Sequence, residues 1–186
     1  MPAARRFVRD LVLAGGHVGA PTVKALGRLG VPVLKLGVPA SVAESREQVV
    51  AVGRALGRGA HAAALAARID AAVASGGSGR GRWALIRQGG GLVAGPGTLA
   101  DEMLRRAGWR NAARLYGLAA WDVVGLEPLL ARPPAVVFTD LSRPDAARGA
   151  ALLRRAGVRV VDFPMRLLSC GGPNIVPAMA ALRAAG

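Results

Sequence analysis

Cysteine, histidine and aromatic residues are scarce in this sequence of 186 residues, which holds one Cys, two His, three Trp, three Phe and one Tyr. The lone cysteine, Cys170, excludes an intrachain disulfide and a zinc site made of several cysteines. With so few aromatic residues, the core has to be filled mainly by Ala, Leu and Val. Long apolar runs are also missing, so the sequence predicts no transmembrane helix, which needs roughly 18 or more apolar residues.

Acidic residues are few as well: the sequence has 11 Asp and Glu against 25 Lys and Arg, which gives a net charge of +14. Such a charge raises the question of a nucleic-acid partner. The arginines, however, are scattered along expected helices and are not interleaved with aromatic residues that would stack on bases. We therefore expect no nucleic-acid partner. The apolar stretch Leu11–Ala14 is too short for the core of a signal peptide, so none is predicted within this chain.

What the sequence does contain is a strand-helix-strand pattern that occurs twice. The first copy has a short apolar strand at Asp10–Ala14, a helix at Pro21–Leu29 and a strand at Val31–Leu36. The second copy, about 125 positions later, has a strand in 135–139, a helix in 144–156 and a strand in 158–162. This pattern favours parallel pairing of the two strands of each copy. The sequence thus predicts an α/β protein with two Rossmann-like lobes of the same design.

A helical segment separates the two copies. Ser41 and Glu44 have the spacing of a capping box, in which each side chain binds a free backbone N–H of the first turn. Helical periodicity then continues to about Ser75, and the glycine-rich stretch 76–81 that follows predicts a flexible joint. We therefore expect a remnant of an N-terminal α/β lobe in 1–40, a long helical linker in 41–77 and a C-terminal α/β lobe in 78–186.

Candidate catalytic groups are few. No second His, Cys or carboxylate lies at metal-ligand spacing from His17 or His61. The glycines at 89–91 and 95–97 precede a helix, but they lack the spacing of a nucleotide-binding loop. An enzyme of doubly wound α/β type with a nucleotide or metal cofactor stays open as an alternative. It would need His17, Asp140 or Cys170 to converge on a loop. A degenerate interaction module is a second alternative.

Three blocks of residues carry a resemblance to a known family. They are Asp10–Ala14 before a glycine-rich loop, Gly95–Glu102 followed by Arg110–Ala113, and Ser169–Asn174. In this order and spacing they resemble the periplasmic substrate-binding proteins that serve ABC importers for ferric siderophores, vitamin B12 (cobalamin) and haem. The resemblance implies a non-enzymatic, exported protein with no cofactor of its own. It also implies a ligand, an iron chelate, cobalamin or haem, held between two lobes that a long helix bridges.

The resemblance also implies specific contacts. The ligand-binding positions that it transfers are Gly16, His17, Gly91, Leu92, Val93, Trp121, Arg166, Leu167, Leu168 and Cys170. Family members often carry aromatic residues where Leu92 and Leu167 stand, which leaves Trp121 as the large flat anchor. Glu127 matches a glutamate that docks onto an arginine of the membrane permease. Its first-lobe counterpart falls at Pro2, so the first lobe is expected to be shortened, and an oligomer would compensate for it.

Overall fold

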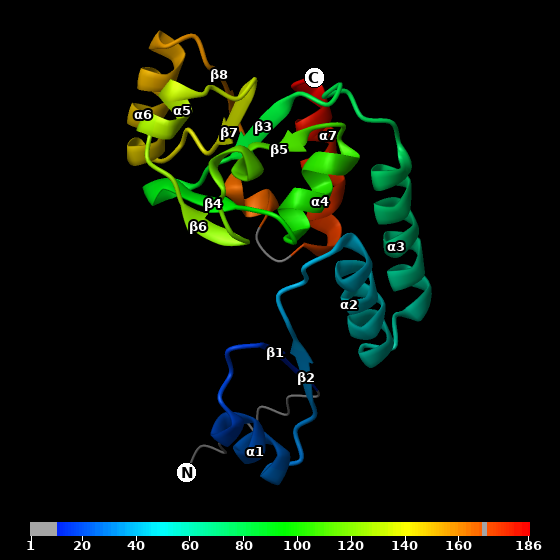
Figure 1. The fold of residues 1–186 in the computed structure, drawn as a ribbon. Coiled ribbons are helices and arrows are strands. Elements are labelled where there is room, and N and C mark those ends of the chain that lie inside the picture. Colours follow the sequence, from blue (N-terminus) through cyan, green and yellow to red (C-terminus); the bar gives the residue numbers. More distant parts are fainter. Residues whose placement is uncertain (1–10, 169–170) are drawn as a thin grey trace.

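The computed structural model describes residues 11–168 and 171–186. It shows a small N-terminal unit joined through two helices to a larger α/β lobe (Figure 1). Asp10, expected in the first strand, and Cys170, expected at the ligand, lie outside the described residues. Within the described ranges, no helix has the length and apolar character needed to cross a membrane.

The small unit is the first strand-helix-strand copy. It consists of β1 (Val12–Gly15), α1 (Ala20–Arg28) and β2 (Val33–Leu36). The two strands pair in parallel, with Val12 opposite Val33, as the pattern predicted. Pro21 stands in the first turn of α1, where its missing N–H breaks no helical hydrogen bond.

The larger lobe is built on a four-stranded sheet in the order β5-β3-β7-β8, in which each neighbouring pair is parallel. The strands are β3 (Trp83–Ile86), β5 (Arg110–Asn111), β7 (Val136–Thr139) and β8 (Arg159–Asp162). Helix α6 (Pro144–Arg155) connects β7 to β8 and completes the second copy of the repeated unit. The fold class expected from the sequence is confirmed.

Alternate residues of the central strands face two separate cores, because successive side chains of a strand point to opposite faces. Ile86 and Phe138 belong to one buried cluster, together with residues of α4 (Leu99–Arg106) and α7 (Ile175–Ala184). Leu85 and Val137 belong to the other, which also contains residues of α5 (Glu127–Ala131) and α6. Helices therefore cover both faces of the parallel sheet.

The small unit lacks such cover. Among described residues 11–37, Ala14 is the one fully buried side chain. Leu13 and Leu29 remain exposed, and α1 has no buried residue. Two strands and one helix cannot enclose a core of their own, since a parallel sheet is normally covered on both faces.

The helical segment forms a hairpin of α2 (Val42–Ala55) and α3 (Gly59–Ala74), which lie side by side (Figure 1). Ser41 Oγ accepts a hydrogen bond from the Glu44 N–H at 3.1 Å, so the expected cap is present. The reciprocal half differs, because the Glu44 carboxylate reaches one residue further and accepts from the Ala40 N–H at 2.8 Å.

The glycine-rich stretch after α3 is not the free joint that its composition predicted. The Ser78 N–H donates to Ala107 O at 3.0 Å and the Gly81 N–H donates to Gly108 O at 2.8 Å. Ser78 Oγ also donates to Arg183 O at 2.6 Å. Glycine serves close backbone approach here, because a Cβ on residue 77 would collide with the Gly108 backbone.

The segment that contains the glycines at 89–91 and 95–97 includes regular structure. Strand β4 (Leu92–Ala94) pairs antiparallel with β6 (Trp121–Val123), with Ala94 opposite Trp121. Short 3-10 turns complete the chain at Gly89–Gly91, Ala112–Tyr116, Met165–Leu167 and Gly172–Asn174. The ribbon was missed because each of its strands is only three residues long, too short for a periodic signal.

Candidate functional site

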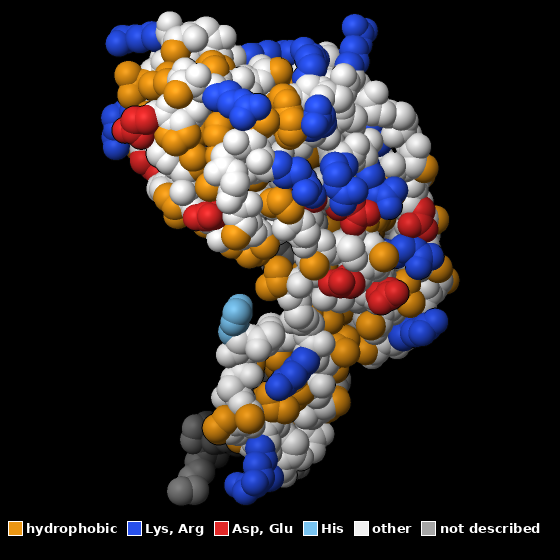
Figure 2. Space-filling view, in the orientation of Figure 1, with side chains coloured by type: hydrophobic (Ala, Val, Ile, Leu, Met, Phe, Trp, Pro, Cys, Tyr) orange, Lys and Arg blue, Asp and Glu red, His pale blue; other side chains and the backbone are white. Residues whose placement is uncertain are grey.

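The molecule is hollowed between the small unit and the larger lobe (Figure 2). A cleft of about 340 Å³ is lined there by segments far apart in the sequence. The lining residues are Val38, Pro39, Ala40, Gln88, Gly97, Thr98, Leu99, Ala100, Met103, Ala120, Trp121, Met165, Leu168 and Gly171. None of these is charged, so the cleft offers mainly apolar contact and a few polar backbone and side-chain groups.

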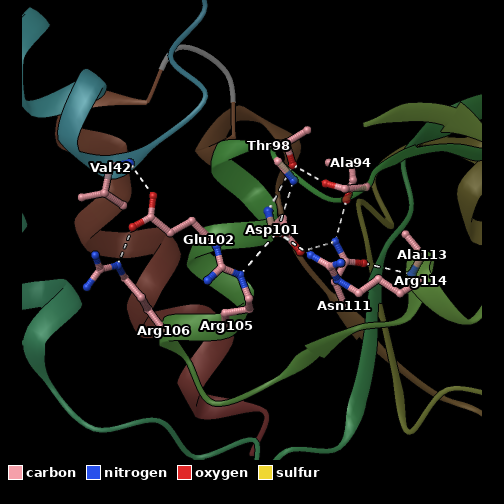
Figure 3. Close-up of polar contacts among 12 residues, drawn as sticks. Val42, Ala94, Thr98, Asp101, Glu102, Arg105, Arg106, Asn111, Ala113 and Arg114 are labelled. Carbon is pink, nitrogen blue, oxygen red and sulfur yellow. Dashed lines mark hydrogen bonds and ion pairs between the residues drawn. The ribbon is translucent and has the colours of Figure 1, made fainter. Parts of the chain in front are cut away.

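The wall of the cleft at the start of α4 is fixed by a buried carboxylate (Figure 3). Asp101 is only 1% exposed, and its Oδ1 accepts a hydrogen bond from Asn111 Nδ2 at 3.0 Å. Its Oδ2 pairs with Arg105 Nε at 3.3 Å and lies 3.7 Å from an Arg114 nitrogen. Thr98 Oγ1 caps the helix by accepting from the Asp101 N–H at 3.1 Å.

The neighbouring acid, Glu102, ties the helical hairpin to this wall (Figure 3). Glu102 Oε2 accepts a hydrogen bond from the Val42 N–H at 2.8 Å, at the first residue of α2. Its Oε1 pairs with Arg106 Nε at 2.7 Å. Because Val38–Ala40 immediately precede α2, this contact also positions the cleft wall that leads to the small unit.

A third carboxylate holds the turn that carries Met165. Asp140 Oδ2 accepts a hydrogen bond from the Met165 N–H at 3.1 Å, while its Oδ1 accepts from Ser142. The hydrogen bond from the Ser142 hydroxyl, followed by the one from the Met165 backbone, lowers the pKa of Asp140 below its ordinary value. Asp140 therefore anchors a loop by accepting hydrogen bonds from backbone and hydroxyl groups.

Two of the residues that the sequence placed at the ligand line this cleft, Trp121 and Leu168. Trp121 is 55% exposed, so much of its ring is free for contact. Leu167 is half-buried and Arg166 is exposed, both on the turn that carries Met165, beside Leu168.

The structure places the other expected contacts elsewhere. Leu92 is half-buried, whereas Val93 is fully buried in the second core cluster and has no free surface. Gly91 is buried with a φ of +85°, and a Cβ there would lie 2.6 Å from Val124 O, which explains the glycine. Gly16 and His17 are exposed after β1 and do not line the cleft.

Sequence reasoning missed most of the cleft wall. Val38–Ala40 fall between the strand expected at Val31–Leu36 and the capping box that begins at Ser41. Thr98–Met103 fall at the start of the helix expected after the glycines at 95–97. Periodicity and caps report which element a residue belongs to, but not which distant segment packs against it. Met165 is the one missed wall residue to which the sequence pointed, because it is next to the expected ligand contact Arg166.

Metal-binding groups do not gather in the part of the chain that the structure describes, where no cluster of three or more His, Cys, Asp or Glu residues is present. The alternative with an enzymatic centre relied on Cys170, which lies outside that part, and on Asp140, whose oxygens are engaged by Ser142 and Met165.

A small strand-helix-strand unit joined by a helical hairpin to a covered α/β lobe, with a cleft between that lobe and the connection Val38–Ala40, defines a bilobal α/β binding protein. The chain belongs to the periplasmic binding protein family, whose model matches residues 10–156. The location that this family implies is the periplasm, and its members are binding proteins that work with ABC transporters. No curated protein matches the chain.

Solved structures support the same assignment. A periplasmic heme-binding protein from Pseudomonas aeruginosa is 30% identical over 95% of this chain and 71% of its own, with a TM-score of 0.68. BhuT, a periplasmic heme-binding protein solved with two hemes, is 28% identical over 95% and 74%, with a TM-score of 0.71. RhuT from Roseiflexus sp. RS-1 is 22% identical over 95% and 76%, with a TM-score of 0.73, and shares the fold.

Proposed function

We propose that this chain is the solute-binding component of an ABC importer and that its cleft holds an iron-siderophore, haem or cobalamin type ligand. The observation that carries the proposal is the cleft itself. It is lined by the connection Val38–Ala40, which leads from the small unit to α2, and by residues of the larger lobe that include Trp121 and Leu168. The heme-binding proteins to which the chain is similar add support.

The lining residues of the cleft suit a large, flat and mostly apolar ligand. Trp121 offers an exposed aromatic ring, and such rings contribute large contact area and stacking. Met103 and Met165 add polarizable thioethers that adapt to irregular shapes. Arg166 is exposed on the neighbouring turn and would pair with a carboxylate or propionate at the ligand's edge.

Replacing Trp121 with alanine is expected to weaken ligand binding about tenfold, because loss of aromatic contact and stacking removes about 1.4 kcal/mol. Calorimetric titration with haemin, cyanocobalamin and a ferric trihydroxamate would measure this. Val123→Ala is the matched control, since Val123 is exposed on the same strand but does not line the cleft. If none of the three chelates raises the melting temperature at concentrations that saturate a micromolar site, the proposed function is wrong.

We also propose that Glu127 docks onto a basic residue of the permease. Glu127 is exposed at the start of α5, next to the exposed Leu130 on the same helix. The ion pairs found among the described residues do not include it.

Glu127→Lys is therefore expected to weaken binding to the importer's reconstituted permease by roughly tenfold or more, because a carboxylate partner becomes a repelling charge. Affinity for the chelate should not change. Glu47→Lys, on the exposed face of α2, serves as the control for the change in net charge. Equal losses in the two variants would show that overall charge, and not a docking contact, governs permease binding.

A further inference from the structure

A second and larger hollow lies on the helical hairpin. Its volume is about 740 Å³, within the range of small-molecule sites. It is lined by α2, α3, the end of β2 and the turn 171–174, and it shares only Gly171 with the cleft. The function proposed above makes no use of this groove.

The groove exists because the two helices approach closely at one point. Gly53 of α2 packs directly on Ala62 of α3, where a Cβ on residue 53 would collide with the Ala62 side chain. These small residues at the helix crossing leave the groove open beside the crossing point. Its floor is aliphatic, formed by Leu36, Val49, Val52 and Leu65, which are half-buried rather than enclosed.

The ionisable side chains on the wall of the groove are all of basic type: Arg58, His61 and Arg68. No Asp or Glu is among the lining residues. Arg58 is the residue just before α3, whereas His61, Leu65 and Arg68 lie within α3, where their spacing of three or four residues places them along one face of the helix. Arg58 and Arg68 take part in none of the ion pairs present among the described residues.

The neutral polar groups of the wall are already engaged within the protein. Gln48 Nε2 donates to Gly37 O at 2.9 Å, and Asn174 Nδ2 donates to Arg166 O at 3.2 Å. Ser45 Oγ accepts from the Gly172 N–H at 2.6 Å. A peptide would bring its own backbone donors and acceptors to a wall whose side chains already pair internally, whereas an alkyl chain makes no such demand.

We propose that this groove binds a long-chain aliphatic monocarboxylate. The alkyl chain lies on the floor formed by Val49, Val52 and Leu65, and the carboxylate pairs with an arginine of the basic wall. Arginine suits this role because its planar guanidinium binds a carboxylate through two parallel hydrogen bonds. The site is separate from the metal-chelate cleft and does not depend on the function proposed for that cleft.

Dodecanoate and dodecan-1-ol, titrated calorimetrically below their aggregation limits, form the first test. The alcohol has the same chain without the charge, so it is expected to bind at least about tenfold more weakly than dodecanoate. Equal affinities would overturn the proposal, because the basic wall would then contribute nothing.

Variants locate the site. The double substitution Arg58→Gln and Arg68→Gln is expected to weaken dodecanoate binding about tenfold or more. Arg154→Gln with Arg155→Gln, on α6, makes the same change in net charge as a control and should leave affinity unchanged. Because Arg58 and Arg68 are exposed, their variants are expected to fold, which circular dichroism would verify. If Trp121→Ala lowers dodecanoate affinity as much as the Arg58 and Arg68 double variant does, the fatty acid occupies the cleft and the proposal is wrong.

Discussion

Replacing Trp109 with alanine is expected to lower the free energy of unfolding by about 3–5 kcal/mol, the range for a buried Phe or Trp truncated to Ala. Trp109 is 2% exposed, and its ring meets Phe138 edge to face at 6.0 Å. Its Nε1 donates to Leu182 O at 2.9 Å, which fixes α7 against the sheet. The substitution therefore leaves a cavity and an unpaired carbonyl at once.

Urea denaturation followed by circular dichroism would measure the loss at Trp109. Trp83→Ala is the matched control, because the Trp83 ring is half-buried and lies under the Arg110 guanidinium at 3.9 Å. That substitution should cost much less, about 1 kcal/mol, since partly exposed aromatic area and one exposed cation–π contact are lost. If both substitutions lowered the free energy of unfolding equally, burial of the Trp109 ring would contribute no more to stability than the half-buried Trp83 ring does.

The second large effect is expected at Asp101. Asp101→Ala should lower the free energy of unfolding by about 2–3 kcal/mol, because charged hydrogen bonds are lost and one N–H of the buried Asn111 amide is left unpaired. Asn111 Nδ2 would keep only its bond to Ala94 O, while Arg105 and Arg114 extend into solvent and would remain hydrated. Loosening of the α4 start, which lines the cleft, should also weaken ligand binding.

Chemical denaturation of Asp101→Ala and Asp101→Asn separates the effect of the charge from that of the side-chain shape. The Asn variant keeps an acceptor oxygen, so its free energy of unfolding should fall less than that of the Ala variant. Asp70→Ala provides the comparison at an exposed ion pair. Asp70 pairs with Arg46 at 2.9 Å, and the two side chains are 51% and 44% exposed. Such surface pairs contribute about 0–1 kcal/mol. If Asp101→Ala costs no more than Asp70→Ala, the buried network does not hold the cleft wall.

The contrast between Asp101 and Ser41 shows where sequence reasoning succeeds. Ser41 caps α2 as predicted, because a helix cap depends on residues three positions apart. Asp101 stood out only as part of Gly95–Glu102, one of the blocks that carry the family resemblance, yet it is the centre of a buried network. Its partners Asn111 and Arg114 come from β5 and the turn after it, and no local spacing announces them.

The glycines show the same limit. The stretch 76–81 was predicted to be a flexible joint, since glycine-rich segments are usually flexible. In the fold, Gly77 and Gly79 instead let the backbone pass closely over Gly108 and Trp109. Composition cannot distinguish a glycine that gives mobility from one that allows close packing, because the difference depends on which distant segment packs against it.

By itself the sequence determined the α/β class, the repeated strand-helix-strand unit, the helical segment between the copies and the resemblance to a binding-protein family. These features depend on residues close together in the chain, where period, caps and turn residues act. Only the tertiary structure decided that Val93 is buried, that Val38–Ala40 and Met103 form the cleft wall, and that α2 and α3 leave a basic groove. Those outcomes depend on which distant surfaces pack together and how completely they exclude water, and packing of that kind has no local signature.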